Sequence, residues 1–268
     1  MNGTIRIHVM QIGRVVIDRA LPFLEKSFHP VAFSGWFRNP ANLLNMPVNA
    51  YLIEHPKGLV LVDTGWGAMV RDDQIEYMGE FHLSLNKAVL PEGQAVHEQL
   101  AAMGIKPSDL DYVVCTHLHS DHGGGLQHVR DAKKILVSEL EYQFGDRDMM
   151  IWRDIPFETF KFEPSPYGPQ KQAFDLFNDG SIVFVHTPGH TPGIASTLVQ
   201  ANGKAFLMFA DVGYARQSWE DMIMPGVCLD PVKARASLEW VKSVASQANC
   251  VEAIATHEPT SKPHVITL

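Results

Sequence analysis

Residues 116–125 read THLHSDHGGG and place three imidazoles and a carboxylate within six positions. His117, His119, Asp121 and His122 are all side chains that bind divalent metal ions. If the local chain is extended, His117 and His119 project to the same side and can bind one ion. Asp121 and His122 then point elsewhere and can begin a second site. The alternative, a solvated polar loop, accounts poorly for three histidines gathered beside an aspartate and three glycines.

Three further candidate ligands follow apolar segments later in the chain. His190 lies in TPGHTPG at 187–193, Asp211 follows KAFLMFA, and His257 follows CVEAIA. Each alone is an ordinary polar residue of a turn, but with the first motif they make five histidines and two aspartates, each just past a predicted strand. Imidazole and carboxylate donors without thiolate favour Zn, Fe, Mn or Co, and an aspartate able to bridge predicts two ions.

The elements that position these residues are predicted from apolar periodicity and turn residues. Helical patterns cover 92–103 and 231–246, and another helix begins at 139–144. Two segments, 66–91 and 145–169, carry no regular pattern and are expected to form lids or flexible loops. Strand patterns cover 4–18 with a break at Gly13, 47–54, 58–63, 112–115, 133–138, 181–186, 195–200, 204–210 and 250–255.

The strands and helices fall into two comparable halves. This order favours two sheets packed together with helices outside over a doubly wound parallel sheet, in which strands and helices would alternate more strictly. No shift in composition marks a linker along the 268 residues. The sequence therefore predicts one domain over residues 1–268.

Composition disfavours nucleic-acid-binding, membrane-spanning and disulfide-rich secreted proteins. The net charge of −8 disfavours a nucleic-acid-binding protein, which needs a basic face. No apolar run approaches the roughly 18–20 residues of a membrane span. The start, MNGTIRIHVM, alternates like a strand rather than a signal peptide, and Cys115, Cys228 and Cys250 are too scattered for a disulfide framework. We therefore expect a cytoplasmic protein without membrane or nucleic-acid partners.

The motifs resemble those of the metallo-β-lactamase superfamily, over nearly the whole chain. LVDTGWG at 61–67, THLHSDHGGG, TPGHTPG, the strand ending in aspartate and the last strand ending in histidine occur in that family's order. The resemblance implies an α/β (α+β) fold, an αββα sandwich of two similar halves with the metal site at the shared edge of the sheets. It implies one ion on His117, His119 and His190, another on Asp121, His122 and His257, and Asp211 with a hydroxide bridging them. Asp63 would lie behind the ligands and orient them, the alternative being a simple turn-forming aspartate.

Within the superfamily the chain looks most like the N-acyl-homoserine lactonases, the quorum-quenching branch. LLNMPVNAYLIEH at 43–55 resembles their amino-terminal segment, and Tyr214 stands three residues after the bridging aspartate as it does there. In that branch the tyrosine hydroxyl contacts the lactone carbonyl; the alternative is an ordinary half-buried tyrosine. Two residues depart from the pattern: Ser120 replaces an aromatic residue and Glu258 replaces a frequent aspartate. Ser120 would alter the acyl pocket.

The resemblance implies a metal-dependent hydrolase that opens a small-molecule lactone. The bridging hydroxide would attack the carbonyl, and Asp121 would relay a proton to the leaving alkoxide. Zn is the expected metal, with Fe, Mn or Co as alternatives, and the protein would be a monomer or homodimer. Other lactones, a thioester as in glyoxalase II, a phosphoester, a mononuclear iron dioxygenase and a non-catalytic metal-binding protein remain as alternatives. The acyl chain would lie among some of the apolar residues of 20–48: Leu21, Phe23, Leu24, Phe28, Phe33, Trp36, Phe37, Leu43, Leu44 and Met46.

Overall fold

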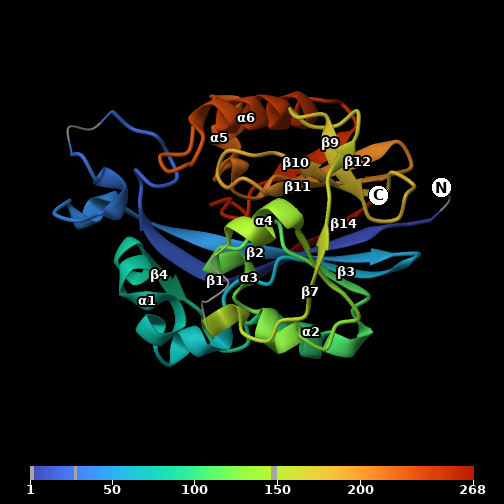
Figure 1. Ribbon diagram of the computed structural model, residues 1–268, viewed down its shortest axis with the longest axis horizontal. Helices are drawn as coiled ribbons and strands as arrows, with labels where there is room; N and C mark the ends of the chain where they lie inside the picture. Colours follow the sequence, from blue (N-terminus) through green and yellow to red (C-terminus); the bar gives the residue numbers. More distant parts are fainter. Residues whose placement is uncertain (1–2, 27–28, 146–149) are drawn as a thin grey trace.

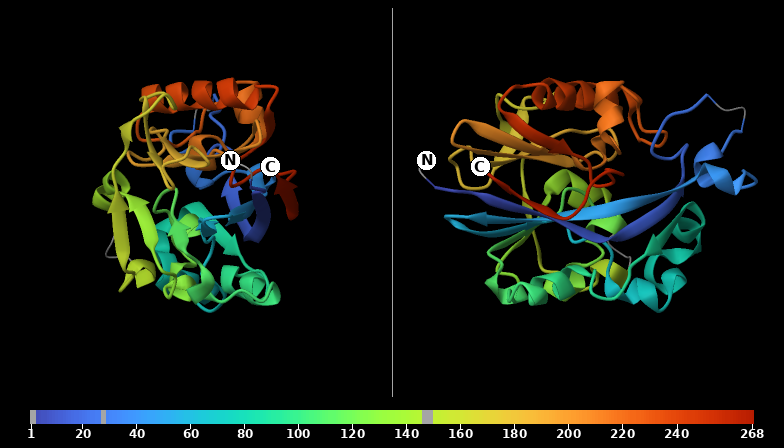
Figure 2. Two further views of the ribbon diagram at one scale, coloured as in Figure 1. Left: turned by 90° about the vertical axis from the view of Figure 1, so that its right-hand side faces the viewer. Right: turned by 180° about the vertical axis from the view of Figure 1, so that it is seen from behind.

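A computed structural model describes residues 3–26, 29–145 and 150–268 of the chain. In these ranges the strands form two mixed sheets that pack face to face, with helices on both outer sides (Figure 1). Seen from the side and from behind, the layers follow one another as helix, sheet, sheet and helix (Figure 2). The predicted αββα sandwich is therefore confirmed. The described helices include none long and apolar enough to cross a membrane.

The first sheet is built mainly from the amino-terminal half of the chain. Its described strands are ordered β14-β1-β2-β3-β5-β6-β7, and β4 pairs with a further part of β1. Neighbours from β3 to β7 in this order run parallel, so the chain leaves each of them at the same edge of the sheet. The strands are β1 (Arg6–Asp18), β2 (Leu43–His55), β3 (Gly58–Val62), β4 (Asn86–Val89), β5 (Tyr112–Val114), β6 (Ile135–Ser138), β7 (Phe157–Phe160) and β14 (His264–Thr267).

The second sheet is built from the carboxy-terminal half and has the order β13-β12-β11-β10-β9-β8. Only β12 and β13 are parallel neighbours among its described strands. The strands are β8 (Glu163–Pro164), β9 (Gln172–Asp175), β10 (Ile182–His186), β11 (Ala195–Ala201), β12 (Lys204–Met208) and β13 (Cys250–Ile254).

The helices occupy both outer layers and the edge of the sandwich. In Figures 1 and 2, α5 and α6 lie outside the second sheet, and α1 and α2 lie outside the first. The short helices α3 and α4 lie near the edge where the two sheets meet (Figure 1). The described α-helices are α1 (Gln74–Leu85), α2 (Val96–Ala102), α3 (Ser120–Gly123), α4 (Glu139–Phe144), α5 (Arg216–Glu220) and α6 (Pro231–Ala245).

Alternate residues of the long strands pack into different layers, because successive strand side chains point to opposite faces. In β2, Leu52 belongs to the core beneath α1 and α2, whereas Tyr51 and Ile53 belong to the core between the sheets. In β12, Phe206 faces the other sheet and Leu207 faces α6. Both faces of these strands are therefore buried, which explains their nearly continuous apolar sequences. Each fully buried large apolar side chain contributes roughly 1.5–3 kcal/mol.

Most predicted elements are confirmed, including both predicted hairpins. β2 and β3 are antiparallel and joined at residues 55–58. β11 and β12 are joined through Asn202 and Gly203, whose φ values of 51° and 76° suit a two-residue turn of type I′. The expected break at Gly13 is a bulge: β1 continues, but its register against β2 shifts between Gln11 and Arg14. There Gly13 has φ +76°, and a Cβ on it would lie 2.5 Å from the Val89 carbonyl oxygen.

The expectation that 66–91 and 145–169 are irregular was wrong. The first segment contains α1 and β4, and the second contains β7 and β8. Gly79 inside α1 has φ +81°, so the helix is kinked and its apolar residues keep no single period. β4 and β7 are each only four residues long and gain their regular form by pairing with β1 and β6. Such short strands carry too little local pattern to be recognised.

Candidate metal centre

The seven candidate ligands lie just beyond the carboxyl ends of strands from both sheets. One strand of the first sheet and three strands of the second deliver them, which explains why distant residues meet at the edge of the sandwich. They follow β5 (His117, His119, Asp121 and His122), β10 (His190), β12 (Asp211) and β13 (His257).

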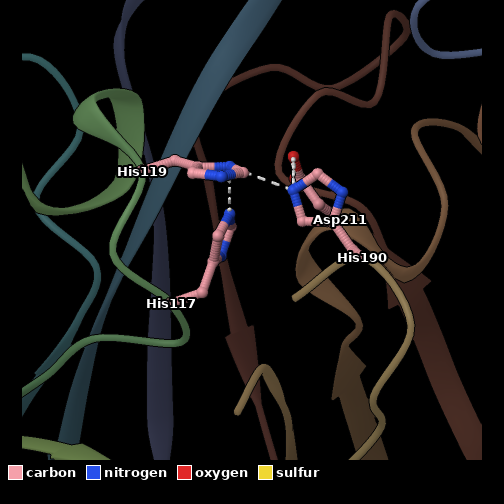
Figure 3. Close-up of side chains that lie close together, drawn as sticks. All are labelled: His117, His119, His190 and Asp211. Atoms are coloured by element: carbon pink, nitrogen blue, oxygen red, sulfur yellow. Dashed lines mark hydrogen bonds and ion pairs between the residues drawn. The ribbon is translucent and has the colours of Figure 1, made fainter. Parts of the chain in front are cut away.

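Four of these side chains form a first cluster (Figure 3). One nitrogen or oxygen from each of His117, His119, His190 and Asp211 lies within 4.8 Å of the others. His119 Nδ1 is 3.0 Å from His117 Nε2 and 3.0 Å from His190 Nε2. Asp211 Oδ2 completes the group at 3.6 Å from His190 Nε2. This convergence of three imidazoles and a carboxylate is what one divalent ion requires.

Asp121, His122 and His257 form a second cluster, and Asp211 lies between the two. His257 Nε2 is 3.3 Å from Asp121 Oδ2. Asp211 Oδ1 faces this side, at 3.3 Å from His122 Nε2 and 3.5 Å from His257 Nε2, while its Oδ2 faces His190. One carboxylate therefore presents an oxygen to each cluster, which is the arrangement needed to bridge two ions.

Buried polar atoms without hydrogen bonds support this interpretation. His122 Nε2 and Asp211 Oδ1 are both buried and neither makes a hydrogen bond, although they lie 3.3 Å apart. An unsatisfied buried polar atom costs about 1–3 kcal/mol, more when charged, so each such atom needs an explanation, and a bound ion is one. The donors are imidazole and carboxylate only, which suits Zn, Fe, Mn or Co. The residues present therefore fit a pair of divalent ions.

The histidines of the first cluster are held in the neutral form. Burial and the neighbouring imidazoles of His122 and His119 lower the pKa of His117 well below its ordinary value. Burial, with a further contribution from His190, lowers the pKa of His119 to about 3, although His119 keeps an exposed edge in the site. Burial also lowers the pKa of His190. Neutral imidazoles are the form that binds metal, so these rings need not lose a proton first.

The two histidines of the second cluster have raised pKa values, because carboxylates lie beside them. Burial alone would lower the pKa of His257, but the carboxylates of Asp211 and Asp121 outweigh it and raise that pKa to about 9. The same competition, with Asp63 added, raises the pKa of His122 well above its ordinary value. Protons and metal ions compete for these nitrogens, and the carboxylates attract either kind of cation.

Hydrogen bonds behind the ligands orient their rings. Asp63 accepts a hydrogen bond from the Thr116 backbone N–H at 2.8 Å, and its other oxygen lies 2.9 Å from His122 Nδ1. His257 Nδ1 similarly lies 2.9 Å from the Pro47 carbonyl oxygen. These contacts fix the proton on Nδ1 and turn Nε2 of both rings toward the centre. Asp63 is thus in contact with one candidate ligand, His122.

A cavity of about 370 Å³ opens over both clusters. Tyr214, only 3% exposed, lines it and stacks on His257 with ring centroids 5.4 Å apart. Burial and the carboxylates of Asp211 and Asp121 raise the pKa of Tyr214 well above its ordinary value, so its hydroxyl keeps its proton. Ser120 also lines the cavity, whereas Glu258 lies outside the lining and accepts a hydrogen bond from the Arg216 backbone N–H at 2.6 Å.

The cavity walls come mostly from elements other than the segment expected to supply them. Leu21 is the lining residue from the described part of 20–48, and the expected Phe28 lies outside the described residues. Phe37 is 98% exposed, far from the burial that an acyl pocket requires. Apolar walls come instead from β1, α1, α4 and two loops: Val15, Ile17, Phe81, Leu85, Leu118, Phe144 and Val227.

Two further side chains hydrogen-bond to loops of the site, and neither was predicted from the sequence. The Tyr77 hydroxyl, in α1, accepts a hydrogen bond from the Gly67 N–H at 2.9 Å and donates to the Ser120 carbonyl at 3.2 Å. Glu141, in α4, contacts both ligand-bearing loops. Tyr77 lay in a segment without pattern, and a glutamate in the first turn of a helix is ordinary. Nothing local distinguished either residue.

Sequence comparisons show which family the chain belongs to. The profile of the metallo-beta-lactamase superfamily matches residues 44–247. The N-acyl homoserine lactonase AttM of Agrobacterium fabrum is 30% identical over 220 residues, which cover 80% of this chain and 82% of that relative. The N-acyl homoserine lactonase of Bacillus cereus is 27% identical over 208 residues, which cover 76% and 79% respectively.

Solved structures show the same fold. One of them is an N-acyl homoserine lactone hydrolase with the product N-hexanoyl-L-homoserine bound at its catalytic metal center. It aligns with a TM-score of 0.74 and 23% identity, and the alignment covers 94% of this chain and 93% of that one. AidC, a dizinc quorum-quenching lactonase, aligns with a TM-score of 0.64 and 16% identity over 97% and 89%. The chain therefore belongs to the metallo-beta-lactamase superfamily, in the branch of the N-acyl homoserine lactonases.

Proposed function

We propose that this chain is a dinuclear metal-dependent hydrolase that opens the ring of a lactone, with an N-acyl homoserine lactone as the substrate. The observation that carries the proposal is the pair of His/Asp clusters sharing Asp211 at the floor of a cavity with apolar walls. Relatives named as N-acyl homoserine lactonases, at 27–30% identity, support the choice of substrate.

The first cluster would hold one ion through its three histidines, the second would hold the other, and Asp211 would bridge them. Divalent ions held by these residues would lower the pKa of a bound water from 15.7 toward about 7 and would polarise the substrate carbonyl. Zn is the proposed metal, with Fe, Mn or Co as alternatives that the same donors accept.

Two side chains of the site would act on the lactone directly. Tyr214 lines the cavity beside His190 and His257, and its protonated hydroxyl would donate a hydrogen bond to the oxygen that becomes negative as the carbonyl is attacked. Asp121 also lines the cavity and would carry a proton to the alkoxide that leaves when the ring opens. The catalytic residues of this proposal are therefore Asp121 and Tyr214.

The apolar walls would receive the acyl chain of the substrate. Phe81, Leu85 and Val15 line the same cavity as the candidate ligands, so a lactone head at the metal centre and an apolar tail along the walls can be bound together. We also infer that residues 1–268 act as one domain, because ligands from both sheets are needed to complete the centre.

Ring opening releases acid, which gives a direct test. Purified protein reconstituted with Zn²⁺ would be mixed with short-chain and long-chain N-acyl homoserine lactones, and proton release would be followed with a pH indicator. Wild-type protein should release acid and His117→Ala should not, because it lacks a ligand of the first cluster.

The other candidate reactions form the second arm of the experiment. If no lactone causes proton release but the same preparation turns over a thioester or a phosphoester, the proposed substrate is rejected. The proposal of a metal-dependent hydrolase then still stands. Oxygen consumption by protein containing a single iron would reject hydrolysis altogether.

A further inference from the structure

A buried carboxylate outside the ligand set hydrogen-bonds to both loops that carry the first cluster. Glu141 is only 1% exposed. Its Oε1 accepts a hydrogen bond from the Leu118 backbone N–H at 3.0 Å. Its Oε2 accepts one from the Thr191 hydroxyl at 2.7 Å and one from the Gly193 backbone N–H at 3.2 Å. One side chain therefore satisfies donors from two separate loops.

Two of these three donors belong to immediate neighbours of candidate ligands. Leu118 stands between His117 and His119, and Thr191 directly follows His190. His119 and His190 are 71 positions apart in sequence, yet their ring nitrogens lie 3.0 Å apart. A carboxylate that binds the Leu118 backbone N–H beside His119 and the Thr191 hydroxyl beside His190 links the two loops at this point.

The start of α4 holds the same loop by independent contacts. The Ser138 hydroxyl donates to the Gly193 carbonyl at 2.7 Å and accepts from the Glu141 backbone N–H at 3.1 Å. The approach is so close that a Cβ on Gly193 would lie 2.2 Å from the Glu141 nitrogen. The backbone at Glu141 is therefore held against the Gly193 loop by contacts that do not involve its own side chain.

The second cluster is oriented by different groups. His122 is held by Asp63, and His257 by the Pro47 carbonyl. Asp121 and His122 follow Leu118 in the same loop, but the donors to Glu141 stand directly beside His117, His119 and His190, so its removal should affect the two metal sites unequally.

We propose that Glu141 is a positioning residue that holds the His117 and His119 segment against the His190 loop and so sets the metal affinity of the first cluster. This inference rests on the dinuclear centre of the proposed function. Groups that orient ligands from behind typically change metal affinity by about 10–100-fold when they are replaced.

Glu141→Gln tests the contact with little change in size. The amide oxygen can still accept from Leu118, but its NH₂ group then faces the Gly193 N–H, so two donors oppose each other. Thr191→Val removes one donor and leaves the carboxylate, which gives a milder variant if Glu141→Gln folds poorly. Glu139→Gln is the matched control, since Glu139 lies in the same helix and pairs with Lys161 at the surface.

Metal-free protein would be titrated with Co²⁺ against a competing chelator, and the visible absorption of bound Co²⁺ would report each binding event. We expect Glu141→Gln to weaken one of the two ions by about 10–100-fold and to leave the other unchanged. Thr191→Val should weaken the same ion by less, and Glu139→Gln should match the wild type. Added to His190→Ala, which already disrupts the first cluster, Glu141→Gln should cause no further loss.

Equal weakening of both ions, or unchanged affinities with only a lower melting temperature, would overturn the inference. If Glu141→Gln does not fold, unchanged binding by Thr191→Val would overturn it. The titration is independent of substrate: wild-type protein that binds two ions but opens no lactone refutes the proposed substrate alone. Wild-type protein that binds no ion would refute both proposals.

Discussion

Replacing Tyr214 with phenylalanine would remove a single hydroxyl from the cavity wall. The ring is almost fully buried and stacks on His257 at an interplanar angle of 13°, and phenylalanine can keep both features. Burial and the charge of Asp211 raise the pKa of Tyr214, so the group that is lost is a protonated donor at neutral pH. Tyr214 is not among the seven candidate ligands, so the metal content should not change.

Loss of one donor to a developing oxyanion typically costs about 2.7–4 kcal/mol, which is about 100–1,000-fold in kcat. KM should change little, because the hydrogen bond strengthens only as charge develops on the carbonyl oxygen. Proton release with the cognate lactone would measure both constants, and metal analysis would check the occupancy.

Tyr51→Phe is a suitable control, because it also removes a buried hydroxyl, one that donates to the Ala255 carbonyl at 3.4 Å outside the cavity lining. The Asn49 side chain still donates to that carbonyl in the control variant. A kcat for Tyr214→Phe within about threefold of wild type, with full metal occupancy, would refute the role of the hydroxyl as oxyanion donor.

Two further changes probe the second cluster and the surface beneath the first sheet. Asp121→Asn should lose the second ion and most turnover, because an amide supplies neither the charge nor the proton relay; a fully active protein with two ions would contradict the dinuclear assignment. Glu98 accepts hydrogen bonds from Arg71 at 2.7 and 2.8 Å, which lower its pKa from 4.5 to about 2. The resulting stability is complete above the ordinary pKa and is lost as the pH falls toward 2. Urea unfolding of wild type and Glu98→Gln should therefore differ by about 1 kcal/mol at pH 7 and converge near pH 2. If the difference in the free energy of unfolding did not change with pH, the ion pair between Glu98 and Arg71 would be ruled out as the cause of that difference.

Strand ends and turns could be predicted locally because their signals lie within a few residues. The turn at 55–58 and the Asn202-Gly203 pair mark hairpins without any knowledge of distant partners. The same local patterns placed every candidate ligand just past a strand, and the structure agrees. A cluster such as His117, His119 and His122 is recognisable from residue types alone, since few other roles need them together.

The segments whose structure was predicted wrongly depend on contacts with residues far away in the sequence. β4 is regular because it pairs with β1, and α1 is interrupted at Gly79 and packs beneath the first sheet. The cavity walls Phe81 and Leu85 lie in that helix and could not be assigned before its position was known. The apolar residues of 20–48 were equally plausible by composition, but of the described ones Leu21 alone lines the cavity.

Residue types and spacing were sufficient to name the candidate donors, the kind of metal they suit and the layered fold, because these follow from side-chain chemistry and short-range periodicity. Folding alone determined the distances: parallel strands end at the same edge, and the packing of the two sheets brings His119 to 3.0 Å from His190. Folding also places Tyr77 and Glu141 beside the site, where their buried hydrogen bonds join loops that are far apart in sequence. No local pattern encodes such contacts, because they depend on where two separate loops end in space.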